Sequence, residues 1–323
     1  NLYGFLIIEF LLVFLFFYIF LKFFNVLKLK KFESLVLVLF IFSISSIVDI
    51  FGLNAFSYVG ALQEFYNLRI PRPIVSQLYF FLFILLLIFK NKNDKFKIWE
   101  LILLGILFSS MWGSFYYNLA LSCLSFSIYY FYIKGFNILK IPFYIKDACI
   151  ISICFVIFSV PLILILFNSE PDYLVRVGLF ELNLDKKIII LNHIISKIFS
   201  LKFFIVFLTI NLFYFYLIKI SPYKKEAINL LYIIFLGSFL GPIFFIIVSP
   251  SVSEIYHFMN LLVSVTFFVL SIFIFLFFFN AIQNPSIKKY ILISVIFIMC
   301  VLYISNNFLI MKKNFHNYLR LNF

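Results

Sequence analysis

The stretch that decides the fold is Leu2–Leu21, LYGFLIIEFLLVFLFFYIFL, which is apolar almost throughout. Two tyrosines, Gly4 and Glu9 are its only interruptions. Twenty helical residues at 1.5 Å per residue extend about 30 Å, the thickness of the hydrocarbon core of a bilayer. The stretch therefore predicts a transmembrane helix, and Glu9, as an acid within it, is a candidate functional residue.

The composition of the whole chain extends this interpretation. The 323 residues are 65% hydrophobic and 12% charged, whereas a soluble globular chain is nearer half apolar and a quarter charged. We predict an all-α polytopic integral membrane helical bundle that forms one transmembrane domain over residues 1–323. The apolar runs predict about ten spans: 2–25, 34–52, 74–89, 98–111, 115–133, 148–167, 201–219, 228–249, 258–280 and 290–306.

Lysine clusters separate alternate pairs of these spans. They comprise Lys22, Lys28, Lys30 and Lys31; Lys90, Lys92, Lys95 and Lys97; Lys134, Lys140 and Lys146; Lys219, Lys224 and Lys225; and Lys288 with Lys289. By the positive-inside rule these clusters face the cytoplasm, which explains the net charge of +13 without a nucleic-acid partner. The clusters at 90–97 and 134–146 share one side only if the chain crosses twice between them. We therefore expect residues 98–133 to form two short spans rather than one long helix.

The opposite, non-cytoplasmic side is predicted to carry a different set of residues. It receives every arginine and histidine, namely Arg69, Arg72, Arg176, Arg320, His193, His257 and His316. A guanidinium is planar, permanently charged and suited to bidentate binding of phosphate or carboxylate. We expect this side to be the working face, with an anionic partner.

The first polar segment of that side covers residues 49–77 and includes FYNLRIPRPIVSQ from residue 65. Pro71 and Pro73 keep the backbone extended around Arg69 and Arg72. The pattern predicts a fork of two positive charges at the mouth of the span that begins at residue 74. The alternative is that the prolines only start the helix, while the arginines pair with nearby carboxylates or lipid headgroups.

The second polar segment, residues 168–200, contains Arg176 and is predicted to form an amphipathic helix. Its apolar residues recur at helical spacing, at Leu184, Ile188, Leu191, Ile195 and Ile198, opposite Lys186, His193 and Lys197. Such a helix lies in the membrane interface. It is either a connector resting on the bilayer or the flank of a groove for a lipid-linked substrate.

The third polar segment is SPSVSEIYHFMN, residues 249–260. Ser251 and Glu254 have the S-x-x-E spacing of a capping box ahead of the span 258–280. His257 follows Glu254 by three residues on the same helical face. The two side chains predict either a general base or a cap with an unrelated histidine. A single E-x-x-H does not predict a metal site.

The remaining motifs favour packing rather than cofactor chemistry. No GxxxxGK[ST], GxGxxG, HExxH or CxxC motif occurs, so no cofactor and no metal site are predicted. The cysteines at 123, 149, 154 and 300 lie within or at the ends of apolar spans and are interpreted as small buried hydrophobes. The segment GSFLGP, Gly237–Pro242, predicts close helix packing with a kink.

The layout resembles the polytopic membrane enzymes of bacterial surface-glycan assembly, the GT-C-like glycosyltransferases and the O-antigen-type polymerases. The resemblance implies an inner-membrane protein that uses a polyprenyl-(di)phosphate-linked sugar on the outer face. It also implies that outer arginines hold the phosphate, which Arg69, Arg72 and Arg176 match, and that an acid near the end of an early span is the base, which Asp49 matches.

Two further classes remain open beside sugar transfer. In the transfer hypothesis, Asp49 or the Glu254 and His257 pair accepts the proton of the acceptor hydroxyl. A transporter or flippase for an anionic lipid-linked sugar would need polar residues near the middle of the membrane. A structural or proton-conducting subunit of a membrane complex would need Lys, Glu or His relays within the membrane.

Overall fold

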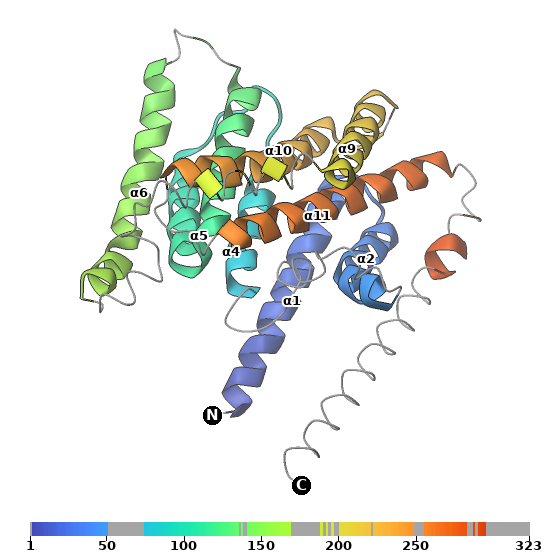
Figure 1. Cartoon of the computed structure of the whole chain (residues 1–323), viewed down its shortest axis with the longest axis horizontal. Helices are drawn as coiled ribbons and strands as arrows, with labels where there is room; N and C mark the ends of the chain where they lie inside the picture. The colour runs from blue at the N-terminus through green and yellow to red at the C-terminus, as the bar shows by residue number, and fades with distance from the viewer. Residues whose placement is uncertain are drawn as a thin grey trace.

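The computed structural model describes residues 2–50, 74–135, 137, 141–168, 188–189, 192, 195–196, 200–220, 222–248, 255–282, 287 and 290–294. All regular secondary structure in these residues is helical, which confirms the predicted all-α class. The helices are α1 (Leu2–Val26), α2 (Lys31–Ile50), α4 (Ile74–Ile88), α5 (Ile98–Lys134), α6 (Ile141–Phe167), α9 (Leu201–Ile220), α10 (Lys225–Val248) and α11 (Ile255–Ala281) (Figure 1).

Two helical segments among the described residues are long and apolar enough to cross a membrane, judged by length and composition. They are Ile141–Ile165 in α6 and Leu261–Ala281 in α11. Only 11% of the α6 segment is buried inside the protein, against 67% of the α11 segment. The outer surface of α6 is therefore apolar, whereas α11 contributes to the interior.

Helix α5 reverses direction within its length. Its backbone is helical over 37 residues, yet the rings of Phe108 and Phe126 lie 6.0 Å apart and Ser122 Oγ lies 3.3 Å from Met111 Sδ. A straight helix would separate residues 108 and 126 by about 27 Å. The axis therefore turns back between residues 111 and 122, as the prediction of two short spans requires. The difference from the prediction is that the backbone remains helical through the turn.

The ends of α5 are set by local hydrogen bonds. At the start, the Lys97 N–H donates to Glu100 Oε2 over 2.6 Å. At the end, Gly135 adopts a φ of 68° and its N–H donates to the Phe131 carbonyl over 2.9 Å. Side chains other than hydrogen rarely tolerate that φ, so glycine is suited to this helix end.

Helix α6 begins at Ile141, earlier than the predicted span 148–167. The prediction had assigned Asp147 to a polar loop. In the structure, Asp147 Oδ2 accepts a hydrogen bond from the Tyr130 hydroxyl over 2.6 Å and lies 3.6 Å from Lys134 Nζ. Because Tyr130 and Lys134 of α5 are partners of the Asp147 carboxylate, Asp147 can lie within α6.

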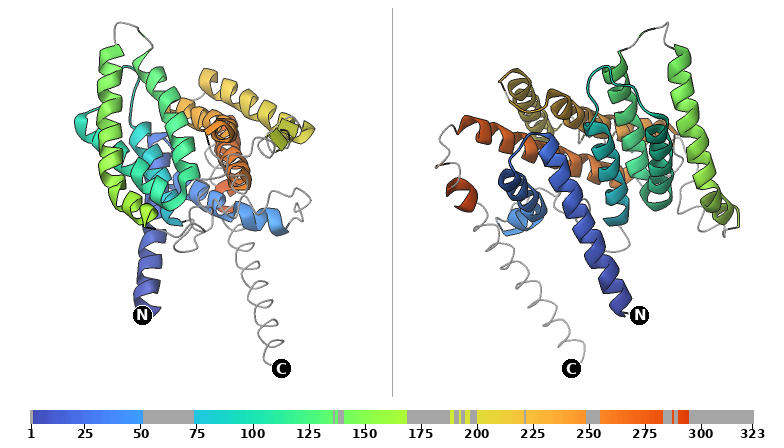
Figure 2. Two further views of the ribbon diagram at one scale, coloured as in Figure 1. Left: turned by 60° about the vertical axis from the view of Figure 1, so that its left-hand side comes forward. Right: turned by 180° about the vertical axis from the view of Figure 1, so that it is seen from behind.

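Small residues bring α6 against the first half of α5 (Figure 2). A Cβ atom at Gly105 would lie 2.6 Å from Cys154 Cβ, so the two helices are in direct contact there. One turn further along, the hydroxyl of Ser159 donates to that of Ser109 over 2.9 Å. This combination of small residues and a hydroxyl pair is typical of closely packed membrane helices.

Phenylalanine forms the centre of the core where α1, α4 and α11 meet. The ring of Phe81 lies 5.2 Å from that of Phe16, 4.5 Å from that of Phe20 and 5.4 Å from that of Phe268, between centroids. Such distances are those of favourable aromatic pairs. Many phenylalanines of this chain are therefore packing residues.

Helices α10 and α11 cross the other helices obliquely rather than aligning with them (Figures 1 and 2). Helix α10 packs against both α5 and α11. A Cβ atom at Gly237 of α10 would lie 2.3 Å from Ser125 Oγ of α5, which confirms the predicted close packing at this glycine. At Gly241 no such packing occurs within the described residues, where a Cβ atom would have no neighbour within 4 Å.

Candidate functional site

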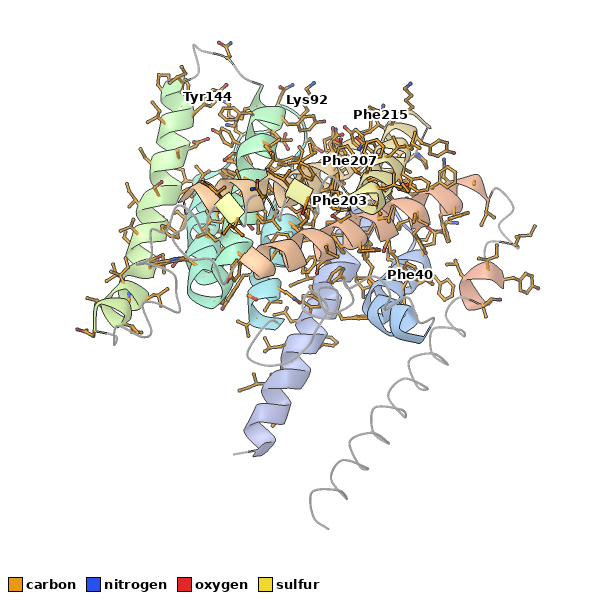
Figure 3. All side chains as sticks on the ribbon, viewed as in Figure 1. Phe40, Lys92, Tyr144, Phe203, Phe207 and Phe215 are labelled. Carbon is orange, nitrogen blue, oxygen red and sulfur yellow. The ribbon has the colours of Figure 1, made fainter. Side chains whose placement is uncertain are left out.

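Four of the predicted lysine clusters come together at one end of the protein, here called the lysine end, which comprises residues 22–33, 88–100, 134–147 and 219–226. The Asn93 N–H donates to the Ile133 carbonyl over 2.9 Å, and Lys224 Nζ donates to the Ile88 carbonyl over 3.0 Å. Lys92 and Tyr144 lie on the same side of the protein (Figure 3). The fifth cluster, at residues 288–289, lies outside the described residues.

Lys224 connects the segments of the lysine end electrostatically. Burial lowers the pKa of Lys224 below the usual range for lysine. The carboxylates of Glu226 and Asp94 oppose this shift in pKa, whereas the ammonium of Lys28 adds to it. The influence of Lys28 places the connection between α1 and α2 beside that between α9 and α10.

A buried ion pair stabilises the loop between α4 and α5. Lys90 Nζ lies 2.6 Å from Glu100 Oε2, and the two side chains retain 8% and 9% of their exposure. Lys90 Nζ also donates to the Lys95 carbonyl over 3.2 Å and lies 5.0 Å from the centroid of the Phe96 ring. All these partners belong to residues 90–100, so the Lys90–Glu100 pair stabilises the conformation of this loop.

Two more carboxylates of the lysine end are held by backbone N–H groups. Glu33 Oε2 accepts from the Lys30 N–H over 3.0 Å, and Asp94 Oδ2 accepts from the Asn91 N–H over 2.8 Å. Glu100 and Asp147 have the partners described above, so these four carboxylates stabilise helix ends, loops and the contact between α5 and α6. Proton-transfer chemistry is therefore better sought away from the lysine end.

The structure describes little of the site predicted from the sequence. Asp49 lies in the last turn of α2 and His257 in the first turn of α11, and their side chains lie outside the description. The other predicted site residues lie outside the described residues altogether: Arg69, Arg72, Arg176 and Glu254. The convergence of these side chains on one cavity stays a prediction. The same holds for the side chain of Glu9.

The predicted amphipathic helix of residues 184–198 is described at five positions. Residues 188, 189, 192, 195 and 196 have helical backbone conformation, and Ile188, Ile189 and Ile195 are exposed. Helical conformation is thus confirmed at these positions. The exposed isoleucines agree with a helix whose apolar face contacts a bilayer.

Uncharged polar side chains are buried on four helices of the bundle. This polar layer consists of Gln77 on α4, Asn118, Ser122 and Ser125 on α5, Ser238 on α10 and Thr266 on α11. Within the described residues, three of its buried oxygen atoms have no hydrogen-bond partner, namely Asn118 Oδ1, Ser125 Oγ and Thr266 Oγ1. Other helical hydroxyls are satisfied locally: Ser127 Oγ and Thr209 Oγ1 each donate to a carbonyl four residues earlier.

Gln77 lies near the start of α4 and Asn118 lies in the turn of α5, both away from the lysine end. The Tyr129 hydroxyl donates to the Leu87 carbonyl over 3.3 Å, so α4 and the second half of α5 lie side by side near the lysine end. Gln77 lies ten residues before Leu87, and Asn118 lies eleven residues before Tyr129. At 1.5 Å per residue, Gln77 is about 15 Å from that contact along α4, whereas Asn118 lies within the turn of α5.

An unpaired buried oxygen is costly. Leaving such a group unsatisfied costs about 1–3 kcal/mol. The groups of the layer are amides and hydroxyls, which donate and accept hydrogen bonds but carry no charge. They suit water or a neutral, hydroxyl-rich ligand better than an ion.

The sequence contains a signal for this layer. Asn118, Ser122 and Ser125 have the spacing i, i+4, i+7, which places them on one face of a helix. The three polar segments predicted above contain charged residues and lie between spans. This polar stripe contains no charged residue and lies within an apolar span, so a search for charge does not find it.

A contrasting pair of asparagines tests whether the Asn118 amide is needed for stability. We expect Asn118→Leu to leave the free energy of unfolding unchanged or raise it by up to about 1 kcal/mol, because Asn118 Oδ1 is buried with no partner among the residues that the structure describes. Asn229→Leu should lower it by about 1–2 kcal/mol. Asn229 Oδ1 accepts from the Tyr214 hydroxyl over 2.8 Å, and Asn229 Nδ2 donates to the Tyr132 hydroxyl. Denaturant titration of the purified proteins in mixed micelles measures both values, and equal losses would contradict the prediction.

Comparison of the chain with protein-family models, with curated proteins and with solved structures finds no match.

Proposed function

We propose that this chain is a polytopic membrane protein of about ten spans that transfers or polymerises a polyprenyl-(di)phosphate-linked sugar. The reaction would occur on the face of the membrane away from the lysine end. The apolar composition, the two long apolar helices and the exposed apolar surface of α6 support a location in the membrane. The gathering of four lysine clusters at one end supports a cytoplasmic lysine end and, with it, the assignment to a bacterial inner membrane.

The observation that carries the proposal is the polar layer. Neutral amide and hydroxyl groups inside an apolar bundle match the hydroxyl groups of a sugar. The arginine-bearing segments follow helix ends that lie away from the lysine end. Helix α2, for example, extends about 30 Å from Lys31 to Ile50. A lipid-linked sugar phosphate carries both hydroxyl groups, which the polar layer would bind, and phosphate, which the arginines would bind.

The proposed reaction is an inverting transfer. The hydroxyl oxygen of the acceptor attacks the anomeric carbon as the bond from that carbon to the phosphate oxygen breaks. Arg69, Arg72 and Arg176 neutralise the charge that develops on the leaving phosphate. The proton of the acceptor passes to Asp49 or to the Glu254 and His257 pair. No nucleotide is consumed, because the phosphate is already an activated leaving group.

Removal of two arginines tests the proposal. We expect Arg69→Ala with Arg72→Ala to reduce product formation about 100-fold, the effect of losing electrostatic stabilisation of a leaving group. Arg69→Lys with Arg72→Lys should retain part of the product formation, because lysine keeps the positive charge but lacks the bidentate geometry of arginine. Glycan produced by a complemented deletion strain measures both effects. Lys312→Ala with Lys313→Ala removes two positive charges from a segment with no proposed role and is the control. Normal glycan from the Arg69→Ala, Arg72→Ala variant would refute the assignment.

Transport of the same substrate is the second candidate, and the polar layer favours it too. A transporter needs polar groups near the middle of the membrane, and Ser125 lies near the middle of the second half of α5. The two candidates differ in product. In proteoliposomes, a transferase joins a labelled lipid-linked sugar to an acceptor, whereas a flippase moves the intact molecule between leaflets. Movement without a new glycosidic bond would favour transport.

A further inference from the structure

The lysine end carries one sign of charge on its surface. Ten of its lysines are exposed: Lys22, Lys28, Lys30, Lys31, Lys92, Lys95, Lys97, Lys146, Lys219 and Lys225, here called the lysine face. Among the described side chains of the lysine end, no carboxylate is exposed. The five that are described there are Glu33, Asp94, Glu100, Asp147 and Glu226, and each is buried or half-buried.

The contacts of these carboxylates explain the separation of charge. Glu100 pairs with the buried Lys90, and Asp147 lies beside Lys134. Neither of these two acids is paired with a lysine of the lysine face. Orientation in the membrane requires only positive loops. It does not require that the acids be withdrawn from the surface, so the uncompensated charge calls for an external anion.

Apolar side chains lie directly beside the lysine face. Trp99 is 55% exposed and lies two residues after Lys97 in the first turn of α5. Phe143 is exposed in the first turn of α6, three residues before Lys146, and Phe89 is exposed next to Lys90. A nucleic acid or an acidic soluble protein would leave these rings in water. The headgroup layer of a bilayer places anionic phosphates beside hydrocarbon, and tryptophan is enriched at that boundary.

We propose that the lysine face binds the headgroups of anionic phospholipids in the leaflet that surrounds it, with Trp99 at the boundary between headgroups and hydrocarbon. The proposal rests on the membrane location proposed above but not on the reaction. Basic residues near an anionic membrane surface attract its lipids, and salt weakens this attraction. The lysine face would thus select lipid composition around this end of the protein.

The two tryptophans of the chain, Trp99 and Trp112, provide a matched experiment. Trp112→Phe leaves Trp99 as the reporter at the lysine face, and Trp99→Phe leaves Trp112, which lies near the turn of α5, as the control. Each variant is reconstituted into vesicles of phosphatidylcholine mixed with brominated phosphatidylglycerol or with brominated phosphatidylcholine. Quenching of tryptophan fluorescence then gives the relative binding constant of the two lipids at each tryptophan.

At Trp99 we expect the anionic lipid to bind at least about fivefold more strongly than the zwitterionic lipid, and at Trp112 about equally. Lys95→Gln with Lys97→Gln, or roughly 0.5 M salt, should reduce the preference at Trp99. An equal affinity at Trp99, or a preference that survives both changes, would overturn the proposal in favour of a soluble acidic partner. Failure of either lipid to quench either tryptophan would instead refute the membrane location.

Discussion

Glu100→Gln is expected to lower the free energy of unfolding by about 3–5 kcal/mol, the cost of leaving one charge of a buried pair without its partner. Glu100 and Lys90 are buried side by side, with 2.6 Å between Oε2 and Nζ. Glutamine preserves the shape of the side chain, and its oxygen can still accept the hydrogen bond from the Lys97 N–H. The variant therefore isolates the loss of charge, which leaves the ammonium of Lys90 buried and uncompensated.

A double variant provides the control for this prediction. Lys90→Met combined with Glu100→Gln removes the uncompensated ammonium and should recover most of the lost stability, since neutral replacements of a buried pair are often tolerated. Asp147→Asn changes the pair with Lys134, which is wider at 3.6 Å and more exposed at 17% and 16%. We expect this variant to cost only about 1 kcal/mol. Denaturant titration in mixed micelles compares all three variants. An effect of Glu100→Gln no larger than that of Asp147→Asn would contradict the prediction.

Gly105→Ala is expected to lower the free energy of unfolding by about 3 kcal/mol, at the upper end of the usual cost of overpacking a core. A Cβ atom at this position would lie 2.6 Å from Cys154 Cβ and 2.7 Å from the Ile151 carbonyl oxygen of α6. Both atoms belong to the backbone or are bonded directly to it, so neither can move without α6 moving. The variant should push α6 away from α5, and the rate of maleimide labelling of Cys154 should rise.

Gly113→Ala is the matched control for Gly105→Ala. Gly113 lies where α5 begins to turn, and among the described residues a Cβ atom there would meet only the flexible end of Leu162, at 3.4 Å. Alanine is the better helix former by about 1 kcal/mol, so Gly113→Ala should leave stability unchanged or raise it. Equal losses from the two variants would mean that glycine is needed in α5 for a reason other than contact with α6.

Much of the helical architecture could be predicted because apolar run length determines where a helix can lie. Leu2–Val26 and Leu201–Ile220 match the predicted spans 2–25 and 201–219 within a residue. The reversal of α5 was predicted from charge alone, because lysines on both sides of residues 98–133 had to share one end. The start of α6 was predicted seven residues too late, at 148 rather than 141, since the sequence does not reveal that Asp147 has partners on α5.

The charged residues of the candidate site were predicted from the sequence, whereas its uncharged residues were identified only in the structure. The segregation of arginine from lysine is visible in the sequence, and Asp49, Arg69, Arg72, Arg176, Glu254 and His257 remain the predicted site on that basis. The polar layer needed the structure. The spacing of Asn118, Ser122 and Ser125 shows that they share a face, but not that this face is buried or that Asn118 Oδ1 has no partner there.

By itself, the sequence determined that the chain is helical, approximately where its helices lie, and which loops carry positive charge. These properties depend on hydrophobicity and charge, which each segment possesses before it contacts any other. Tertiary structure alone decided which acids neutralise which lysines, which glycines admit a neighbouring helix and which polar atoms stay unpaired. Each of these depends on distances of a few ångströms between residues far apart in the chain, which only packing sets.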